Sequence, residues 1–185
     1  ERDIILAVNG QKMATAREFA DRIRGLRFGE RDRRIERTVA VLGDRIWLTL
    51  AVEQGVVRTR LNGDDMQTAE HVSQEVVCLD ARAGKILWHT KLFDVDKPDP
   101  VHWFNSWATP TPVVERDRLY CDFGTFGTAC LNAKSGKVAW KARLPLDHQV
   151  GPGSSPVLYK NLLVLVRDGR DAQYVAALDK RTGKQ

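Results

Sequence analysis

Apolar residues along the chain fall into short runs separated by polar turns, a pattern that predicts β-hairpins. Residues 76–79 form one such run, which leads into a turn at 81–84 and a returning strand at 85–89. A second kind of hairpin lies upstream. In Thr111–Gly124, TPVVERDRLYCDFG, it reads as strand, polar turn and strand, with a proline at the first strand residue, where a strand tolerates it. The pattern therefore predicts a mainly β chain.

The downstream hairpin occurs three times, so the chain is built from repeats. CLDARAGKILW at Cys78–Trp88 reappears as CLNAKSGKVAW at Cys130–Trp140 and begins again as ALDKRTGK at Ala177. The repeat glycines are 52 and then 47 residues apart. Repeats of this length with two hairpins each predict four-stranded antiparallel blades in a partial β-propeller, about three blades in all. The recurring positions are Asp80, Gly84, Trp88, Asn132, Gly136, Trp140, Asp179 and Gly183.

Each recurring residue type has a physical role in the predicted hairpin. The Asp or Asn side chain can accept hydrogen bonds from the backbone N–H groups of the turn. The glycine supplies the positive φ that closes the turn without strain. The tryptophan is too large for one thin sheet to bury, so we expect it to wedge between neighbouring blades.

The predicted propeller domain spans residues 38–185, and its first blade departs from the common spacing. The excess falls in residues 53–74, which are polar and carry NGDD at their centre. We expect this segment to be an inserted loop or hairpin on the rim of the propeller.

The first 37 residues break the period and predict a small α/β unit, residues 1–37. A strand at 4–8 leads into an Asn9-Gly10 turn, and Thr15 begins a helix as the first residue of a capping box. Apolar residues then recur at helical spacing at Phe19, Ile23 and Leu26. This order resembles the C-terminal half of an HtrA-type PDZ domain. The resemblance implies a peptide-binding fold whose carboxylate-binding loop would precede the first residue, so we expect the chain to be a fragment open at both ends.

The repeat resembles AxDxxTGxxxW, the repeat of the pyrroloquinoline-quinone (PQQ) type of β-propeller. Ala177, Asp179, Thr182 and Gly183 match it outright, and the two earlier copies match with small substitutions. The chain is similar to the PQQ-like repeat proteins of planctomycete-type bacteria and to the barrel-assembly lipoprotein of the outer membrane. These resemblances imply a periplasmic or extracellular location and protein partners.

Composition narrows the function further. The net charge is +5 and 43% of the residues are hydrophobic, so the chain is mildly basic with enough apolar residues for a core. The densest basic stretch, Arg22–Arg37, is interrupted by acidic residues, so we predict no nucleic-acid partner. No long apolar window predicts a membrane span. Three cysteines without CxxC spacing and four scattered histidines predict no metal site.

The resemblance to quinoprotein dehydrogenases would imply a PQQ cofactor with calcium, an Asp base and a disulfide between adjacent cysteines. The chain has no Cys-Cys pair and no ordered acidic cluster. GPGSSP at Gly151–Pro156 is not the GxSxG of hydrolases. We therefore predict no cofactor and favour a non-enzymatic scaffold or binding module. The alternatives are a PQQ-dependent dehydrogenase whose cofactor residues lie in other blades, and the regulatory part of a PDZ-containing protease.

Two loops occupy equivalent places just before a first blade strand, His102–Pro112 and His148–Pro156. Loops that enter the innermost strands line one mouth of a propeller channel, so their polar side chains are expected to converge there on a small ligand. Trp103 and Trp107 would supply a stacking floor. The alternative is that these residues tie the blades together by hydrogen bonds. The candidate ligand-binding residues are His102, Asn105, Ser106, His148, Ser154 and Ser155.

Overall fold

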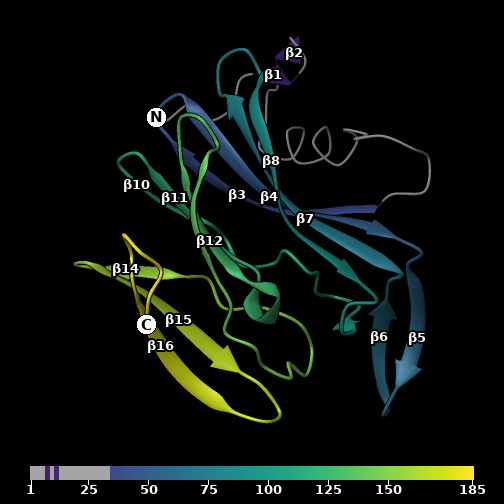
Figure 1. Ribbon diagram of the computed structural model, residues 1–185. Helices are drawn as coiled ribbons and strands as arrows, with labels where there is room; N and C mark the ends of the chain where they lie inside the picture. The colour runs from purple at the N-terminus through teal and green to yellow at the C-terminus, as the bar shows by residue number, and fades with distance from the viewer. Residues whose placement is uncertain (1–6, 9–10, 13–33) are drawn as a thin grey trace, which may run out of the picture.

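The computed structural model describes residues 7–8, 11–12 and 34–185, and antiparallel sheets dominate it (Figure 1). The first large sheet has four strands in the order β3-β4-β7-β8. These strands are β3 (Arg34–Leu42), β4 (Arg45–Gln54), β7 (His71–Asp80) and β8 (Ile86–Asp96). Each neighbouring pair is antiparallel, so this sheet is one four-stranded blade.

Two further sheets repeat this arrangement, which confirms the predicted partial β-propeller. The second has the order β10-β11-β12-β13 and the third β14-β15-β16. Their strands are β10 (Val113–Glu115), β11 (Arg118–Asp122), β12 (Thr128–Asn132), β13 (Val138–Ala142), β14 (Val157–Tyr159), β15 (Leu162–Asp168) and β16 (Gln173–Asp179). In Figure 1 these two sheets follow the first in chain order, from green to yellow.

A smaller three-stranded sheet contains much of the segment 53–74, where the sequence predicts an insertion. β5 (Val57–Leu61) and β6 (Asp64–Thr68) form an antiparallel hairpin. β9 (Val101–His102) pairs with β6, so the sheet order is β5-β6-β9. The hairpin extends away from the three blades at the lower right of Figure 1.

The N-terminal region is described only in part. β1 (Ala7–Val8) and β2 (Gln11–Lys12) pair in antiparallel fashion. The predicted helix from Thr15, and with it most of the PDZ-like segment, lies outside the described residues. β3 begins at Arg34, ahead of the boundary predicted after residue 37.

Two apolar cores lie between consecutive sheets. The first joins Trp47 and Val76 of the first blade to Leu119 of the second. The second joins Tyr120 of the second blade to Leu163 of the third. Because each sheet buries its apolar face against the next, the sheets depend on one another for their stability.

The repeat tryptophans carry this packing from blade to blade. The indole N–H of Trp88 donates to the carbonyl of Ala133, at 3.2 Å, and that of Trp140 donates to the carbonyl of Lys180, at 3.1 Å. A Cβ atom added to Gly136 would lie 2.5 Å from the Trp88 ring, and one added to Gly183 would lie 2.6 Å from the Trp140 ring. Each tryptophan therefore lies on the turn glycine of the following blade, where a larger residue leaves no room.

The repeat Asp and Asn side chains hold the turns on which the tryptophans lie. Asp80 Oδ1 accepts the N–H groups of Arg82 and Ala83 at 2.9 and 2.6 Å. Asn132 and Asp179 accept the equivalent N–H groups of their own turns. The N–H groups of Ala83 and Arg82 lower the pKa of Asp80, because they bond to its charged form.

A second contact repeats between the blades and involves the repeat cysteines. The guanidinium of Arg45 lies 3.8 Å from Cys78 Sγ and donates to the carbonyl of Lys134 in the next blade. Arg118 makes the equivalent contact with Cys130 Sγ, at 3.9 Å. All three cysteines are buried free thiols. Burial raises the pKa of Cys121 well above its usual value, which makes that thiol unreactive at neutral pH.

Candidate functional site

A cavity of about 210 Å³ opens between the second and third blades, and we call it the loop cavity. It lies where the loop before β14 meets the 3₁₀ turn at Gly124–Phe126 and the end of β15. Its polar lining includes Asn105, Asp122, His148, Ser154, Arg167 and Asp168.

The structure places three of the six candidate ligand residues, Asn105, His148 and Ser154, at the loop cavity. Asn105 also ties two loops together, because its Nδ2 donates to the carbonyl of Val150 at 2.9 Å. Ser154 is exposed at the edge of the cavity.

The other three candidate residues lie elsewhere and make local contacts. His102 lies on β9, with its ring 5.3 Å from that of Phe104. Ser106 is buried, and its hydroxyl accepts the N–H of Ala108 at 3.1 Å. Ser155 accepts the N–H of Thr111 at 2.9 Å, which links the loop before the third blade to the start of the second. Of these three contacts, only that of Ser155 joins two blades, and those of His102 and Ser106 stay within one loop.

The expected stacking floor does not form. Trp107 is fully buried, and its indole N–H donates to the carbonyl of Asp99 at 2.9 Å. Its ring belongs to the core between the first two blades, so it presents no face to a ligand. Trp103 lies at a different pocket, on the β5–β6 hairpin.

His148 is the most unusual polar group at the loop cavity. It is only 4% exposed, and neither ring nitrogen has a hydrogen-bond partner among the described residues. Its ring meets that of Phe126 edge to face, with 5.3 Å between the centroids. Burial lowers the pKa of His148, since the low-polarity surroundings disfavour the charged ring. A neutral imidazole at this place can donate one hydrogen bond and accept another.

A buried ion pair forms one wall of the loop cavity and joins two blades. Arg167 on β15 donates to both carboxylate oxygens of Asp122 on β11, at 2.8 and 3.0 Å. Thr128 donates to the same carboxylate at 2.6 Å. Arg167 and Asp122 are 2% and 1% exposed. The sequence analysis missed this pair, although a charged residue directly after the apolar run of a strand is a signal that could have found each partner.

The unpaired burial of His148 predicts a dependence of stability on pH. The unfolded chain takes up a proton near pH 6.5, whereas the folded chain resists it, so stability is full above that pH and falls as the solution is acidified towards the lowered pKa. In His148→Phe the ring packing is kept and the titration is removed. Thermal unfolding between pH 7.5 and 5.5 should therefore show a smaller loss of Tm in the variant than in the wild type. An equal loss in both proteins would contradict the prediction.

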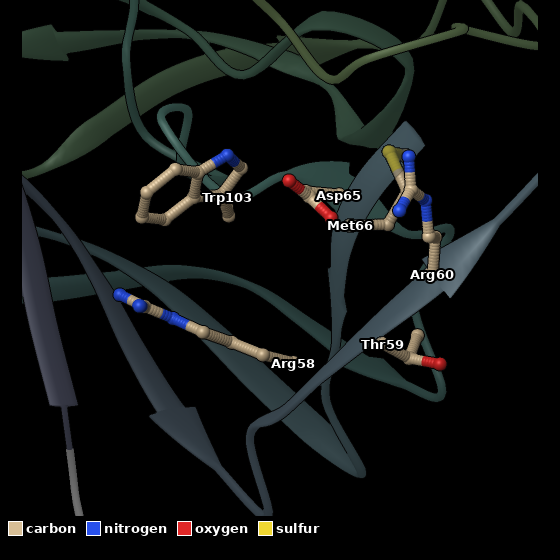
Figure 2. A pocket seen from close by; sticks show the side chains of 6 residues that line it. All are labelled: Arg58, Thr59, Arg60, Asp65, Met66 and Trp103. Atoms are coloured by element: carbon tan, nitrogen blue, oxygen red, sulfur yellow. The ribbon is translucent and has the colours of Figure 1, made fainter. Parts of the chain in front are cut away.

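A second pocket, of about 350 Å³, lies on the β5–β6 hairpin, and we call it the hairpin pocket (Figure 2). Its lining is Arg58, Thr59, Arg60, Asp65, Met66 and Trp103. The guanidinium carbon of Arg58 lies 5.0 Å from the centre of the Trp103 ring, a cation–π contact. Phe104, which is 81% exposed, stacks on Trp103 with 4.2 Å between the ring centroids.

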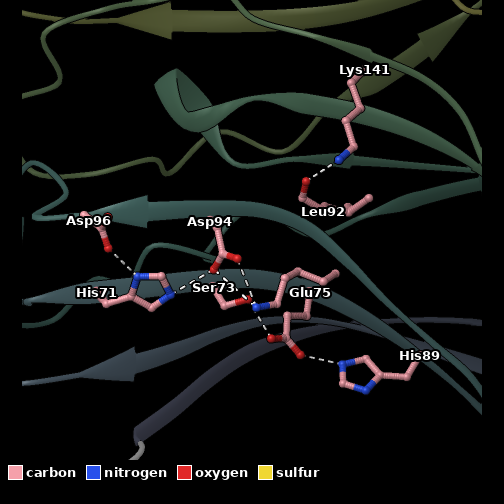
Figure 3. Close-up of polar contacts among 9 residues, drawn as sticks. His71, Ser73, Glu75, His89, Leu92, Asp94, Asp96 and Lys141 are labelled. Carbon is pink, nitrogen blue, oxygen red and sulfur yellow. Dashed lines mark hydrogen bonds and ion pairs between the residues drawn. The ribbon is translucent and has the colours of Figure 1, made fainter.

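A chain of charged groups follows β7 and β8 (Figure 3). His71 lies between two carboxylates, with Nδ1 2.8 Å from Asp96 and Nε2 2.8 Å from Asp94. Because ionised carboxylates only accept, both contacts are hydrogen bonds only when the ring carries both protons. Burial favours a raised pKa for Glu75, but the hydrogen bonds from His89 and Ser73 outweigh it and lower the pKa. Each histidine of this cluster therefore contacts at least one carboxylate.

Neither a metal site nor a membrane-spanning helix is found in the described part of the chain. No group of three or more His, Cys, Asp or Glu side chains there could hold a metal ion. Within the same residues, no helix is long and apolar enough to cross a membrane.

Consecutive antiparallel sheets, Asp-capped turns and tryptophans on the next turn define a PQQ-type repeat propeller. The sequence family described as outer membrane protein assembly factor BamB matches residues 72–185, and the chain belongs to this family. The comparison with curated proteins finds no match. None of the comparisons supports the PDZ-like start.

Solved structures similar to the chain include BamB and alcohol or methanol dehydrogenases. BamB from Moraxella catarrhalis is 14% identical, over 80% of this chain and 46% of that one, with a TM-score of 0.48. A europium-containing methanol dehydrogenase is 17% identical, over 72% of this chain and 25% of the dehydrogenase, with a TM-score of 0.42. The quinohemoprotein alcohol dehydrogenase ADHIIG from Pseudomonas putida HK5 is 20% identical, over 72% of this chain and 19% of that enzyme, with a TM-score of 0.43. The chain thus spans less than half the length of each, and the likeness concerns the fold alone.

Proposed function

We propose that the protein is a non-enzymatic, extracytoplasmic scaffold or binding module that mediates protein interactions. The observation that carries this proposal is the exposed aromatic surface of Trp103 and Phe104 beside the hairpin pocket. An aromatic ring that is 81% exposed and stacked on a second ring is typical of a contact surface for another protein. Membership of the BamB family, whose description is that of an assembly factor, supports the same function and a periplasmic location.

The domain organisation that we propose places an N-terminal unit in residues 1–37 before a propeller domain in 38–185. The alternative of a regulatory part in a PDZ-containing protease depends on that N-terminal unit. The scaffold function depends on the propeller alone, because the contact surface and both pockets lie within it.

A PQQ-dependent dehydrogenase is the second candidate and belongs to a different class, and the described residues offer no group of three or more His, Cys, Asp or Glu side chains for its calcium ion. Calcium would need several free oxygen ligands. Asp122 is engaged by Arg167, and Asp94 and Asp96 are engaged by His71. The dehydrogenase alternative therefore requires cofactor residues in other blades.

Binding of a small polar ligand in the loop cavity is a further candidate, which the unpartnered ring of His148 favours. Asn105 and Ser154 would contribute polar contacts beside it. A neutral ligand suits this cavity, because its buried charges, Asp122 and Arg167, already neutralise each other.

Cross-linking in intact cells tests the scaffold function. A photo-reactive amino acid at position 104 is expected to give discrete adducts of higher mass, because Phe104 protrudes from the surface. The same amino acid at position 116, an exposed turn between β10 and β11, serves as the control and should give none. Absence of adducts at position 104, together with alcohol oxidation that requires added PQQ and Ca²⁺, would replace the scaffold by the dehydrogenase.

A further inference from the structure

We propose that the hairpin pocket binds an extended acidic segment of a protein partner. This inference rests on the proposed scaffold function and names the chemistry of the partner. The pocket is an open hollow on the β5–β6 hairpin, with two arginines, one tryptophan and one methionine among its six lining residues (Figure 2).

The charge of the pocket favours an anionic occupant. Arg58 and Arg60 stand two positions apart on β5, so their side chains leave the same face of the strand. Both are exposed, and neither guanidinium has an ion-pair partner among the described residues. Figure 2 shows the Arg58 side chain extending from β5 towards Trp103, and the Arg60 side chain ending beside Met66. Two cations against one carboxylate leave this hollow with an excess positive charge.

Arginine is suited to carboxylates in particular. Its planar fork makes two parallel hydrogen bonds to one carboxylate, which a single ammonium group does not. Arg167 pairs with Asp122 in this way inside the same protein. Arg60 uses its Nε for the carbonyl of Gly63, at 3.1 Å, so this hydrogen bond leaves its two terminal nitrogens for other partners.

Apolar groups beside the two arginines add a place for an uncharged side chain. Met66 is buried and lines the pocket beside Arg60, and Trp103 lines it on the side of Arg58 in Figure 2. Phe104 extends this apolar surface into solvent. An acidic segment that carries one aromatic or aliphatic residue therefore matches both parts of the pocket.

The position of the hairpin in its sheet favours an extended segment. The sheet order is β5-β6-β9, so β5 is an edge strand in the described part of the chain. β5 contains no proline, so its backbone can pair with an added strand. An added strand would place its alternate side chains along the row of Arg58 and Arg60.

Nucleic acid fits the pocket less well, although it is also anionic. Single strands bind by stacking bases on free aromatic faces along a continuous basic groove. Arg58 and Phe104 already contact the Trp103 ring, so a base that stacked on it would have to displace one of them. The carboxylate of Asp65 lines the same pocket and would oppose a phosphate chain.

The test uses fluorescence anisotropy of the full chain with a defined probe. The probe is a fluorescein-labelled peptide that alternates glutamate with serine and carries one central phenylalanine. Two matched probes serve for comparison. The first is the same peptide with lysine in place of each glutamate, and the second is a labelled oligothymidylate. The glutamate peptide is expected to bind, and more weakly as salt is added, because its contacts to Arg58 and Arg60 are exposed to solvent.

The double variant Arg58→Glu/Arg60→Glu should weaken binding of the glutamate peptide by about tenfold or more, because it replaces two attractive contacts with repulsion. The control Arg116→Glu/Lys160→Glu makes the same change of net charge on two exposed turns and should shift binding by less than about twofold. Circular dichroism and thermal unfolding establish that both variants are folded.

Tighter binding of the lysine peptide or the oligothymidylate would overturn the inference, as would a folded Arg58→Glu/Arg60→Glu variant that binds within about twofold of the wild type. Cross-linking at position 104 separates the two proposals. Adducts that persist while the peptide fails leave the scaffold function intact and remove only the acidic partner.

Discussion

Replacing Gly136 with alanine is expected to destabilise the protein by about 2–5 kcal/mol. Gly136 has a φ of +71°, which an L-residue adopts only at a cost. The added Cβ would also lie 2.5 Å from the Trp88 ring and 2.8 Å from Thr90 Oγ1, so the first blade must shift away from the second. Urea denaturation followed by circular dichroism measures the loss.

Gly43→Ala is the matched control for this substitution. Gly43 has a φ of +61°, but nothing lies within 4 Å of the Cβ that alanine would add. Gly43→Ala should reduce the free energy of unfolding only by the cost of a positive φ in an L-residue, about 1–2 kcal/mol. In a Trp88→Ala background, Gly136→Ala should lose less than in the wild type, because the ring is gone and only Thr90 Oγ1 stays close to the added Cβ. Equal losses at both glycines in the wild-type background would show that the contact between Trp88 and Gly136 contributes nothing.

The sequence predicts the fold well because the fold is repeated and local. Each turn is specified within a few residues by an Asp or Asn that caps it and a glycine that closes it, as at Asn132 and Gly136. The contact between Trp88 and Gly136 is not specified within a few residues in this way. It joins one repeat to the next, and a repeat pattern gives the role of each residue type without saying which two copies touch.

The loop cavity shows where prediction from the sequence ends. The equivalent positions of two loops in the repeat suffice to predict that polar residues of both loops lie together, and Asn105, His148 and Ser154 do line one cavity. The equivalence of the loops does not distinguish an aromatic ring that faces a ligand from one that enters the core. The prediction that Trp107 forms a stacking floor is therefore wrong. The pairing of β9 with the inserted hairpin was also missed, because a two-residue strand leaves no periodic signal.

Breaking the buried pair between Asp122 and Arg167 is the other change for which we expect a large effect. Asp122→Ala should cost about 3–5 kcal/mol, since it leaves the guanidinium of Arg167 buried without its carboxylate. The double variant Asp122→Leu/Arg167→Met removes both charges together and should recover much of that loss, because apolar side chains of similar volume suit a site that is 1–2% exposed. Urea denaturation of the wild type, Asp122→Leu, Arg167→Met and the double variant gives the coupling energy of the pair.

The pair between Asp147 and Arg170 provides the control at the surface of the same two blades. Its atoms are 3.5 Å apart and its side chains are about half exposed, so solvent already screens the interaction. Asp147→Ala should therefore cost less than about 1 kcal/mol. If Asp122→Ala were no more costly than Asp147→Ala, the buried pair would not hold the third blade to the second. The apolar core around Tyr120 and Leu163 and the hydrogen bond from Trp140 to Lys180 would then account for that contact.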